Sequence, residues 1–473
     1  MAGRTLLDKL WLQHLIADLG DGASLLHIDR IFLHERTGSV ALQTLQADGR
    51  AVRHPELVFC TMDHIVDTLP GRGDETRMPG GRAFIETTRA AARGAGIRLF
   101  DVNHPQQGIV HVISPELGIV LPGTTVVCPD SHTCTQGALG ALAWGIGSSE
   151  AEHALATQTL RVGRPGAMRL RFDGRLREGV TAKDMILWLI ARHGASGAAG
   201  HAIEFAGEAV RALPVEARLT LCNMAVEFSA FTGLIAPDDT VFEYLHGRPF
   251  APQGRAWEQA LHSWRQLASD DDAAFDREIE VDAGSIAPMV TWGTSPQHAM
   301  PIDSAVPDPL HEPDAHTRQA MERALSYMDL EPGQRLPGLP IGAAFIGSCT
   351  NARLSDLRAA ASVLRGRHVA PGVRAICVPG SQQVKRDAEA EGLHHVFTQA
   401  GFEWREPGCS MCFFAGGESF GHRQRVVSTT NRNFEGRQGP ETRSHLASPA
   451  TVAASAVAGC MADPRALAGA GHG

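Results

Sequence analysis

The sequence predicts an α/β protein with more than one domain, built on mostly parallel sheets with helices on both faces. Segments with the character of strands and helices alternate along the first and last thirds of the chain, which is the pattern of βαβ units. A chain of 473 residues is also too long for one hydrophobic core, so two to four domains are expected.

In the N-terminal third, expected strands end in acids and histidines. Apolar strands over 57–60 and 125–128 are each followed by an aspartate and a histidine, and the segment 108–111 is expected to end a third strand. Functional loops of open α/β sheets lie at the carboxyl ends of strands. The polar residues that this places at a candidate site are Asp63, His64, His111, Asp130 and His132.

Further strands are expected in the rest of the chain. The segment 170–295 mixes strands and helices, and 301–317 is rich in Pro, Asp and His, as in a linker between domains. Apolar segments beyond it predict strands over 343–346, 373–378 and 426–429. The last third therefore repeats the alternation seen in the first.

Capping signals predict where several helices begin. Ser149 and Glu152 have the spacing of a capping box, which predicts a helix through Leu155 and Leu160. In the last third, the expected caps are Asn351 for a helix over 354–364, Ser381 for the next one, and Ser448 with Pro449 for a last, alanine-rich helix that ends at Gly459.

Composition excludes several classes of function. The formal net charge of −9 argues against nucleic acid or an anionic membrane as the main partner. No apolar run is long enough to span a bilayer, and the start of the chain lacks the apolar stretch of a secretory signal. Cysteines in apolar strands are expected to be buried thiols, which predicts a reducing compartment, the cytoplasm. Lysine occurs only at Lys9, Lys183 and Lys385, and arginine supplies the other basic residues.

Three cysteines are candidates for metal ligands. Cys349 follows an expected strand, and Cys409 and Cys412 lie in a turn after Pro407 and Gly408. Three thiolates leave one corner of a metal or cubane cluster open, and a substrate can bind there. A C-x-x-C pair alone could equally be half of a zinc site or a redox pair. The preceding Pro-Gly disfavours a redox pair, whereas an iron–sulfur cluster and a zinc site both stay open at this point.

Other polar residues have a chemical and a structural interpretation. An aspartate beside a histidine suits proton transfer, although a structural role is common for such a pair. Asn223 and Glu227 would share one face of a helix, or act as a cap and a solvated side chain. Arginine forks bind carboxylates, so the turn that holds Asn431, Arg432 and Arg437 is either a binding loop or a surface loop.

Together these motifs resemble the aconitase superfamily, and most closely its branch of isopropylmalate isomerase large subunits. The resemblance covers nearly the whole chain, from about residue 4 to 466. The segments that carry it are 61–64, 103–111, 130–133, 221–224, 290–294, 346–351, 407–412 and 431–437.

This resemblance implies three α/β domains, over 1–168, 169–300 and 301–473, with the active site in the cleft between them. It also implies one [4Fe–4S] cluster per chain, held by Cys349, Cys409 and Cys412. One iron would have no cysteine ligand, would bind a carboxylate and the hydroxyl of a hydroxy-diacid substrate, and would act as a Lewis acid.

The resemblance further implies a hydro-lyase reaction, in which 2-isopropylmalate is dehydrated to an alkene diacid and rehydrated to 3-isopropylmalate in leucine biosynthesis. His64, paired with Asp63, would protonate the departing hydroxyl. The other implied roles are holding water and hydroxyl at the cluster (His111, Asp130, His132), joining that network (Asn223, Glu227), and neutralising carboxylate and cluster charge (Asn431, Arg432, Arg437).

A partner is implied as well. Single-chain relatives carry a further swivelling domain with a serine base and more arginines. Because this chain stops at Gly473, the resemblance implies a separate small subunit that carries the swivel domain, and little or no turnover without it.

Departures from the family pattern keep alternatives open. Gln136 stands where a histidine is usual, Pro129 replaces a glycine, and the loop 413–420 differs. The chain could therefore be a paralogue that acts on another 2-hydroxy diacid, such as a methylmalate. A non-catalytic iron sensor that binds RNA is a more distant alternative, against which the acidic charge speaks.

Overall fold

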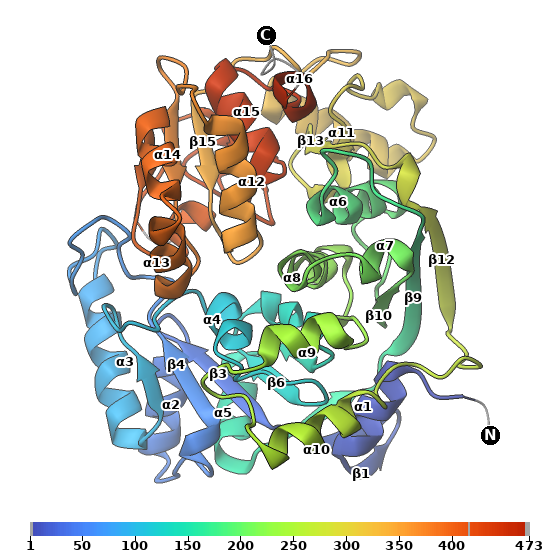
Figure 1. Ribbon diagram of the computed structural model, residues 1–473, viewed down its shortest axis with the longest axis vertical. Coiled ribbons are helices and arrows are strands. Elements are labelled where there is room, and N and C mark those ends of the chain that lie inside the picture. Colours follow the sequence, from blue (N-terminus) through green and yellow to red (C-terminus); the bar gives the residue numbers. More distant parts are fainter. Residues whose placement is uncertain (1–2, 415–416, 469–473) are drawn as a thin grey trace.

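The structure, a computed structural model, describes residues 3–414 and 417–468. Two five-stranded parallel sheets and one four-stranded parallel sheet form its frame (Figure 1). The N-terminal sheet has the order β5 (Arg98–Phe100), β4 (Val58–Thr61), β3 (Arg30–His34), β6 (Thr125–Cys128), β7 (Leu142–Gly145). The C-terminal sheet has the order β17 (Phe402–Trp404), β16 (Arg374–Cys377), β15 (Ala343–Ile346), β18 (Arg425–Ser428), β19 (Arg443–Leu446).

Both five-stranded sheets have the same strand order, in which the chain builds one half of the sheet outward from the first strand and then returns to build the other half. In each, the first strand lies between the second and the fourth strand in chain order, so β3 pairs with β4 and β6, and β15 pairs with β16 and β18. Helical crossovers on either side of such a reversal leave a crevice at the carboxyl ends of the strands, where ligands bind. The strand order thus predicts a ligand site at the carboxyl ends of both sheets.

The middle of the chain forms the four-stranded sheet, in the order β11 (Thr232–Leu234), β10 (His201–Ala206), β9 (Gly166–Asp173), β12 (Arg277–Asp282). Two small antiparallel sheets complete the strands: β1 (Leu15–Gly20), β2 (Ala23–His27) and β8 (Thr159–Gly163), and the hairpin of β13 (Met289–Thr291) and β14 (Ala299–Pro301). Parallel pairing therefore dominates, as the sequence predicts.

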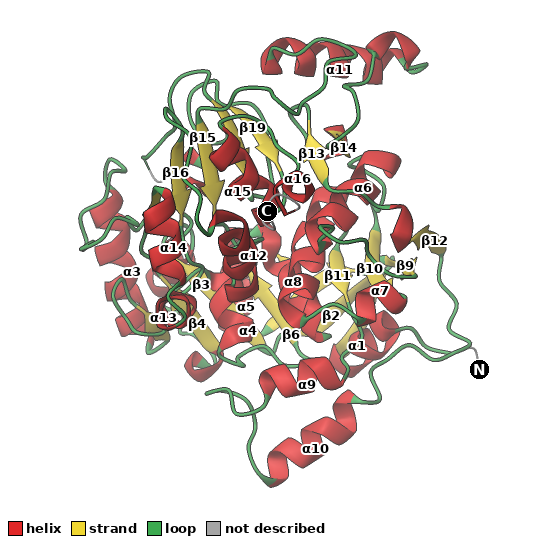
Figure 2. Cartoon of the chain, turned by 45° about the horizontal axis from the view of Figure 1, so that its top comes forward, coloured by secondary structure: helices red, strands yellow, loops and turns green. Residues whose placement is uncertain are grey.

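Sixteen helices are assigned in the described residues, and they pack against the sheets and one another. Figure 2 shows α10 and α11 projecting at opposite ends of the molecule. The bounds are α1 (Leu6–His14), α2 (Gly38–Ala47), α3 (Gly81–Ala95), α4 (Val110–Glu116), α5 (Ser148–Thr157), α6 (Ala182–His193), α7 (Glu208–Arg211), α8 (Val215–Asn223), α9 (Asp239–Leu245), α10 (Arg255–Trp264), α11 (Ala315–Met328), α12 (Leu354–Leu364), α13 (Gln382–Ala390), α14 (Leu393–Ala400), α15 (Pro449–Ala458) and α16 (Pro464–Ala468). Among these residues, no helix has the length and apolarity that crossing a membrane requires.

Strands at the centre of the sheets are buried on both faces. All residues of β4, β6, β15 and β18 are buried, which is what helices packed on a parallel sheet produce. The expected helix caps Ser381 and Ser448 are confirmed, because each side chain accepts a hydrogen bond from the backbone three residues on. The α/β fold class is also confirmed, whereas the domain limits at 168/169 and 300/301 stay a prediction.

Local expectations were wrong at two helix starts. Helix α5 begins at Ser148, because Glu150 and not Glu152 accepts the hydrogen bond of the Gly147 backbone N–H. Leu160 lies beyond that helix, in β8, where it pairs with Leu26. Asn351 does not cap α12, because its amide donates to Asp356 Oδ1, while the other oxygen of Asp356 accepts the backbone N–H of Arg353 at the cap.

Two further assignments differ from expectation. The segment 108–111 ends no strand: Gly108 makes an isolated bridge to Ser381, and His111 lies in the first turn of α4. That helix starts here because Asp63 Oδ2 accepts the backbone N–H of Val110, a contact that sequence spacing does not reveal. Helix α15 is not the last one, since α16 follows it.

Candidate active site

A cavity of about 300 Å³ lies where the carboxyl ends of the two five-stranded sheets meet. Most of the lining residues end or follow β3, β4, β6, β15 and β18, and the others lie at the start of α4 or in the segment between β17 and β18. The lining consists of His34, Arg36, Thr37, His64, Ile109, His111, Pro129, Asp130, Ser131, His132, Cys349, Cys409, Cys412, Phe413, Asn431, Arg432 and Arg437. The three candidate thiols thus share one cavity with all of the predicted histidines and arginines.

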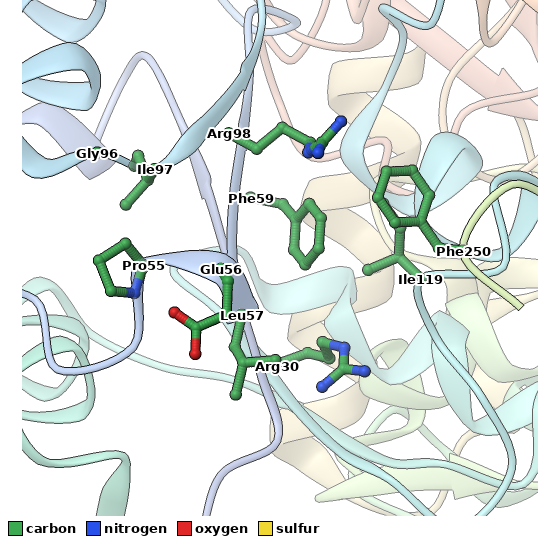
Figure 3. A pocket seen from close by; sticks show the side chains of 10 residues that line it. All are labelled: Arg30, Pro55, Glu56, Leu57, Phe59, Gly96, Ile97, Arg98, Ile119 and Phe250. Atoms are coloured by element: carbon green, nitrogen blue, oxygen red, sulfur yellow. The ribbon is translucent and has the colours of Figure 1, made fainter. Parts of the chain in front are cut away.

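A larger cavity, of about 580 Å³, lies at the opposite edge of the N-terminal sheet (Figure 3). Arg30 and Arg98 are the first residues of β3 and β5, so this cavity opens at the amino ends of the strands. Its lining combines the rings of Phe59 and Phe250 with one carboxylate, Glu56, and contains no thiol or imidazole. Size alone therefore does not locate the chemistry.

Two tight turns bring the thiols together. Ser348 and Ser410 both have positive φ, at 76° and 46°, so the backbone reverses beside Cys349 and inside the Cys409–Cys412 pair. Ser348 Oγ lies 3.3 Å from the sulfur of Cys412 and 4.0 Å from that of Cys349. The backbone N–H of Cys409 donates to Asp63 O over 2.7 Å, which ties this turn to the end of β4.

Nitrogen donors surround the sulfurs. The amides of Asn223 and Asn431 donate to Cys349 Sγ over 3.2 and 3.5 Å, and the guanidinium of Arg437 lies 3.7 Å from Cys412 Sγ. Burial raises the pKa of Cys349 to about 12, with a contribution from neighbouring Cys412. A bound metal supplies the positive charge that ionises such thiols. Three clustered thiols with N–H donors aimed at sulfur therefore fit an iron–sulfur cluster.

Asp63 and His64 form a buried ion pair that points into the cavity. His64 Nδ1 donates to Asp63 Oδ1 over 2.6 Å, and His64 Nε2 lies 3.2 Å from Asp130 Oδ2. Burial alone would lower the pKa of His64, but the charge of Asp63, with further contributions from Cys409 and Asp130, raises it well above its ordinary value. These charges favour the protonated imidazole, and His64 lines the cavity with its Nε2 atom beside Asp130 Oδ2.

Asp130 joins three histidines. Its Oδ1 atom accepts from His111 Nε2 over 3.0 Å and from the backbone N–H of His132 over 2.7 Å, and Oδ2 receives His64. Although burial opposes its ionisation, the charge and hydrogen bonds of His111 and the contacts with His132 and His64 hold the pKa of Asp130 well below its usual range. A carboxylate at the centre of the network stays ionised.

The network continues to the middle of the chain. His132 Nε2 and Arg432 Nε both contact Glu227 Oε1, over 2.8 and 2.7 Å. Asn223 ends α8 and Glu227 lies in the 3-10 turn Met224–Phe228, so the two do not share a helix face, although both reach the site. The junction between α8 and this turn, and not one continuous helix, places Asn223 and Glu227 at the site.

Two further residues at the end of β3 contact the site and were not predicted from the sequence. Glu35, which is fully buried, accepts the backbone N–H groups of Asp63, His64, Ile65 and Val66. His34 stacks on His64 with 4.0 Å between ring centroids, and burial lowers its pKa to about 4. The signal was present, because His34 and Glu35 directly follow an apolar strand in the same way as Asp63 and His64 do.

The departures from the family pattern lie in different places. Gln136 is buried, donates to Ser114 Oγ and does not line the cavity. Pro129 and Phe413 do line it. Of the loop 413–420, residues 415 and 416 lie outside the described residues.

Comparisons with known proteins agree with this geometry. Residues 8–459 match the model of the aconitase family (aconitate hydratase). A curated relative from Bradyrhizobium diazoefficiens, named 3-isopropylmalate dehydratase large subunit 1, is 57% identical over 465 residues, which cover 98% of this chain and 97% of the relative. The 3-isopropylmalate dehydratase large subunit of Roseiflexus castenholzii is 51% identical over 472 residues, covering 98% of this chain and 99% of the relative.

A solved structure, the holo-form of Thermococcus kodakaraensis aconitase X, aligns with 90% of this chain and 89% of its own, at 14% identity and a TM-score of 0.46. The family model spans nearly the whole chain, and both curated relatives do so at more than half identity. The chain therefore belongs to the aconitase family.

Proposed function

We propose that this chain is the large subunit of a 3-isopropylmalate dehydratase, which isomerises 2-isopropylmalate to 3-isopropylmalate in leucine biosynthesis. The observation that carries the proposal is the meeting of three buried thiols with the network of His64, Asp130 and Arg432 in one cavity. The printed names of relatives at 51% and 57% identity favour this substrate. The cytoplasm is the proposed compartment.

Cys349, Cys409 and Cys412 would hold one [4Fe–4S] cluster per chain. When bound, such a cluster supplies an iron without a cysteine ligand, a Lewis acid that makes hydroxide a better leaving group. Around it, Asn223 and Asn431 donate to sulfur and orient the thiol of Cys349.

His64 is the proposed acid of the dehydration step. The substrate loses hydroxide from one carbon and a proton from its neighbour, and His64 Nε2 gives its proton to the departing oxygen so that water leaves. Asp63 holds the ring through Nδ1 and raises its basicity for the return of that proton during rehydration. His111, Asp130 and His132 would hold the water, while Glu227 positions His132.

Arg432 and Arg437 are the proposed carboxylate binders of this chain. Both guanidinium groups line the cavity, and a planar fork matches a carboxylate in bidentate fashion. The base that removes the substrate proton is expected on a small subunit with the swivel domain, because the relatives are named large subunits.

Anaerobic reconstitution tests the proposal. With iron and sulfide the wild-type chain should take up about four of each, and Cys349→Ser, Cys409→Ser and Cys412→Ser should lose most of it. Cys377→Ala, a buried thiol on β16 outside the cavity, is the matched control and should keep full loading. Loading with a single zinc instead, or equal loading in all variants, would refute the cluster.

Activity is then measured by the absorbance of the alkene diacid, with and without the small subunit. Turnover of 2-isopropylmalate by the complex and none by the chain alone is expected. Other 2-hydroxy diacids, including a methylmalate, are assayed in parallel. A higher kcat/KM for one of them would show that this diacid, and not 2-isopropylmalate, is the substrate of the same reaction.

A further inference from the structure

Lys183 is a fully buried cation that the reaction scheme does not use. It lies in the first turn of α6 and is one of only three lysines in a chain that otherwise uses arginine. Its Nζ donates to the main-chain carbonyls of Thr429 and Thr430, each over 2.5 Å. The ammonium group thus bridges the middle of the chain to the end of β18.

No carboxylate neutralises this charge directly. Within the described ranges, no carboxylate oxygen lies within 4.0 Å of Lys183 Nζ. The adjacent Asp184 is committed elsewhere: its Oδ1 accepts the backbone N–H of Met289, and its Oδ2 binds Thr181. An ammonium ion buried without an anionic partner is costly, so negative charge nearby would stabilise the protonated form.

Two kinds of acidic group are close enough to contribute negative charge: the carboxylates of Asp356 and Asp184, and the thiols of Cys412 and Cys349. Burial lowers the pKa of Lys183 to about 7, and the anions that oppose this effect are Asp356, Asp184, Cys412 and Cys349. Asp356 accepts hydrogen bonds from the backbone N–H of Arg353 and the amide of Asn351, and neither of its oxygens lies within 4.0 Å of Lys183 Nζ. A cluster with three thiolate ligands carries net negative charge and would face this cation across the turn.

The carbonyls that Lys183 holds belong to the residues immediately before Asn431 and Arg432. Asn431 donates to the sulfur of Cys349, and Arg432 contacts Glu227. Thr429 also fixes the other turn, since its Oγ1 atom exchanges hydrogen bonds with the N–H and the carbonyl of Gly347, two residues before Cys349. The ammonium group of Lys183 therefore binds a segment that leads into Asn431 and Arg432 and that also contacts the turn before Cys349.

We propose that Lys183 is a positioning residue of the cluster site, whose ammonium group fixes the turn that carries Asn431 and Arg432 and whose charge offsets that of the cluster. This inference rests on the proposed function, because it requires a cluster held by the three cysteines. It assigns to Lys183 no contact with substrate.

The test compares Lys183→Met and Lys183→Gln with the wild-type complex, reconstituted and purified without oxygen. Lys9→Met is the matched control, because Lys9 Nζ also donates to two main-chain carbonyls, those of Gln266 and Ala268, in another part of the fold. Iron content, the midpoint potential of the one-electron reduction followed by electron paramagnetic resonance, and kcat and KM are measured for each.

Both Lys183 variants should show a more negative midpoint potential, because the reduced cluster carries one more negative charge and loses a nearby cation. They should also show a KM raised about tenfold through the displaced Arg432, whereas Lys9→Met should match the wild type. An unchanged potential in either loaded variant would overturn the proposal. Failure of both variants to fold would overturn it too, since Lys183 would then be a general structural residue. Absence of a cluster from the wild type would instead refute the proposed function.

Discussion

Glu35→Gln tests whether a buried carboxylate shapes the loop that carries Asp63 and His64, the proposed catalytic pair. Glu35 Oε1 accepts the backbone N–H groups of His64, Ile65 and Val66 over 2.8, 2.6 and 3.2 Å, and Oε2 accepts that of Asp63 over 3.0 Å. Glutamine has one acceptor oxygen in place of two. If the oxygen of the glutamine amide takes the place of Oε1, the bonds from His64, Ile65 and Val66 are kept. The NH₂ group then takes the place of Oε2 and faces the N–H of Asp63, with which it cannot form a hydrogen bond.

The cost follows from the number of bonds affected. One unpaired buried donor costs about 1–3 kcal/mol, and each retained bond weakens because the acceptor is no longer charged. Relief from burying a charge offsets part of this loss, since burial and the neighbouring Asp63 raise the pKa of Glu35. We expect a net local loss of about 2–4 kcal/mol, which corresponds to amide exchange about 30 to 1,000 times faster in 63–66.

Hydrogen–deuterium exchange read by mass spectrometry on peptides covering 58–70 measures this effect, and kcat should fall as His64 loses its fixed position. Glu150→Gln is the matched control, because Glu150 accepts a single backbone N–H at an exposed helix start. Wild-type exchange rates in 63–66 of the Glu35→Gln chain would refute the reasoning, whatever happens to activity.

Three other outcomes are expected. Asp63→Asn should lower kcat about 10²- to 10⁴-fold with iron content unchanged, because the carboxylate charge that favours protonated His64 is lost from Nδ1; a fully active variant would exclude the pair from proton transfer. Arg432→Met should raise KM more than it lowers kcat in steady-state assays, and an unchanged KM would exclude carboxylate binding by this residue. Burial raises the pKa of Glu116 to about 7, from 4.5, so the folded state retains a proton that the unfolded chain has released, and stability should fall by about 3 kcal/mol as pH rises from 4.5 through 7. Glu116→Gln should abolish that dependence in urea unfolding between pH 5 and 8, and parallel curves for the two proteins would contradict the assignment.

Local signals in the sequence identified many of the residues that meet in the cavity. The strand ends before Asp63, Asp130 and Cys349 were recognisable because burial on both faces produces short apolar runs, and the turns after them carry the polar residues. The fold class followed from the same alternation. Helix starts were less reliable: Glu150 and Glu152 are both compatible with a cap, and only the path of the backbone decides which carboxylate reaches back.

Only the tertiary structure showed which of these residues lie close to one another. Cys349 follows a strand of the C-terminal sheet, and Asp130 follows a strand of the N-terminal sheet. They line one cavity only because the carboxyl ends of the two sheets face each other. The partners of Glu35 and Lys183 could not be predicted from sequence spacing, because they are backbone groups at least 28 and 246 residues away in the chain, beginning with those of Asp63 and Thr429. Residue types and their spacing along the chain encode side-chain chemistry, whereas contacts between distant backbone groups exist only after the chain has folded.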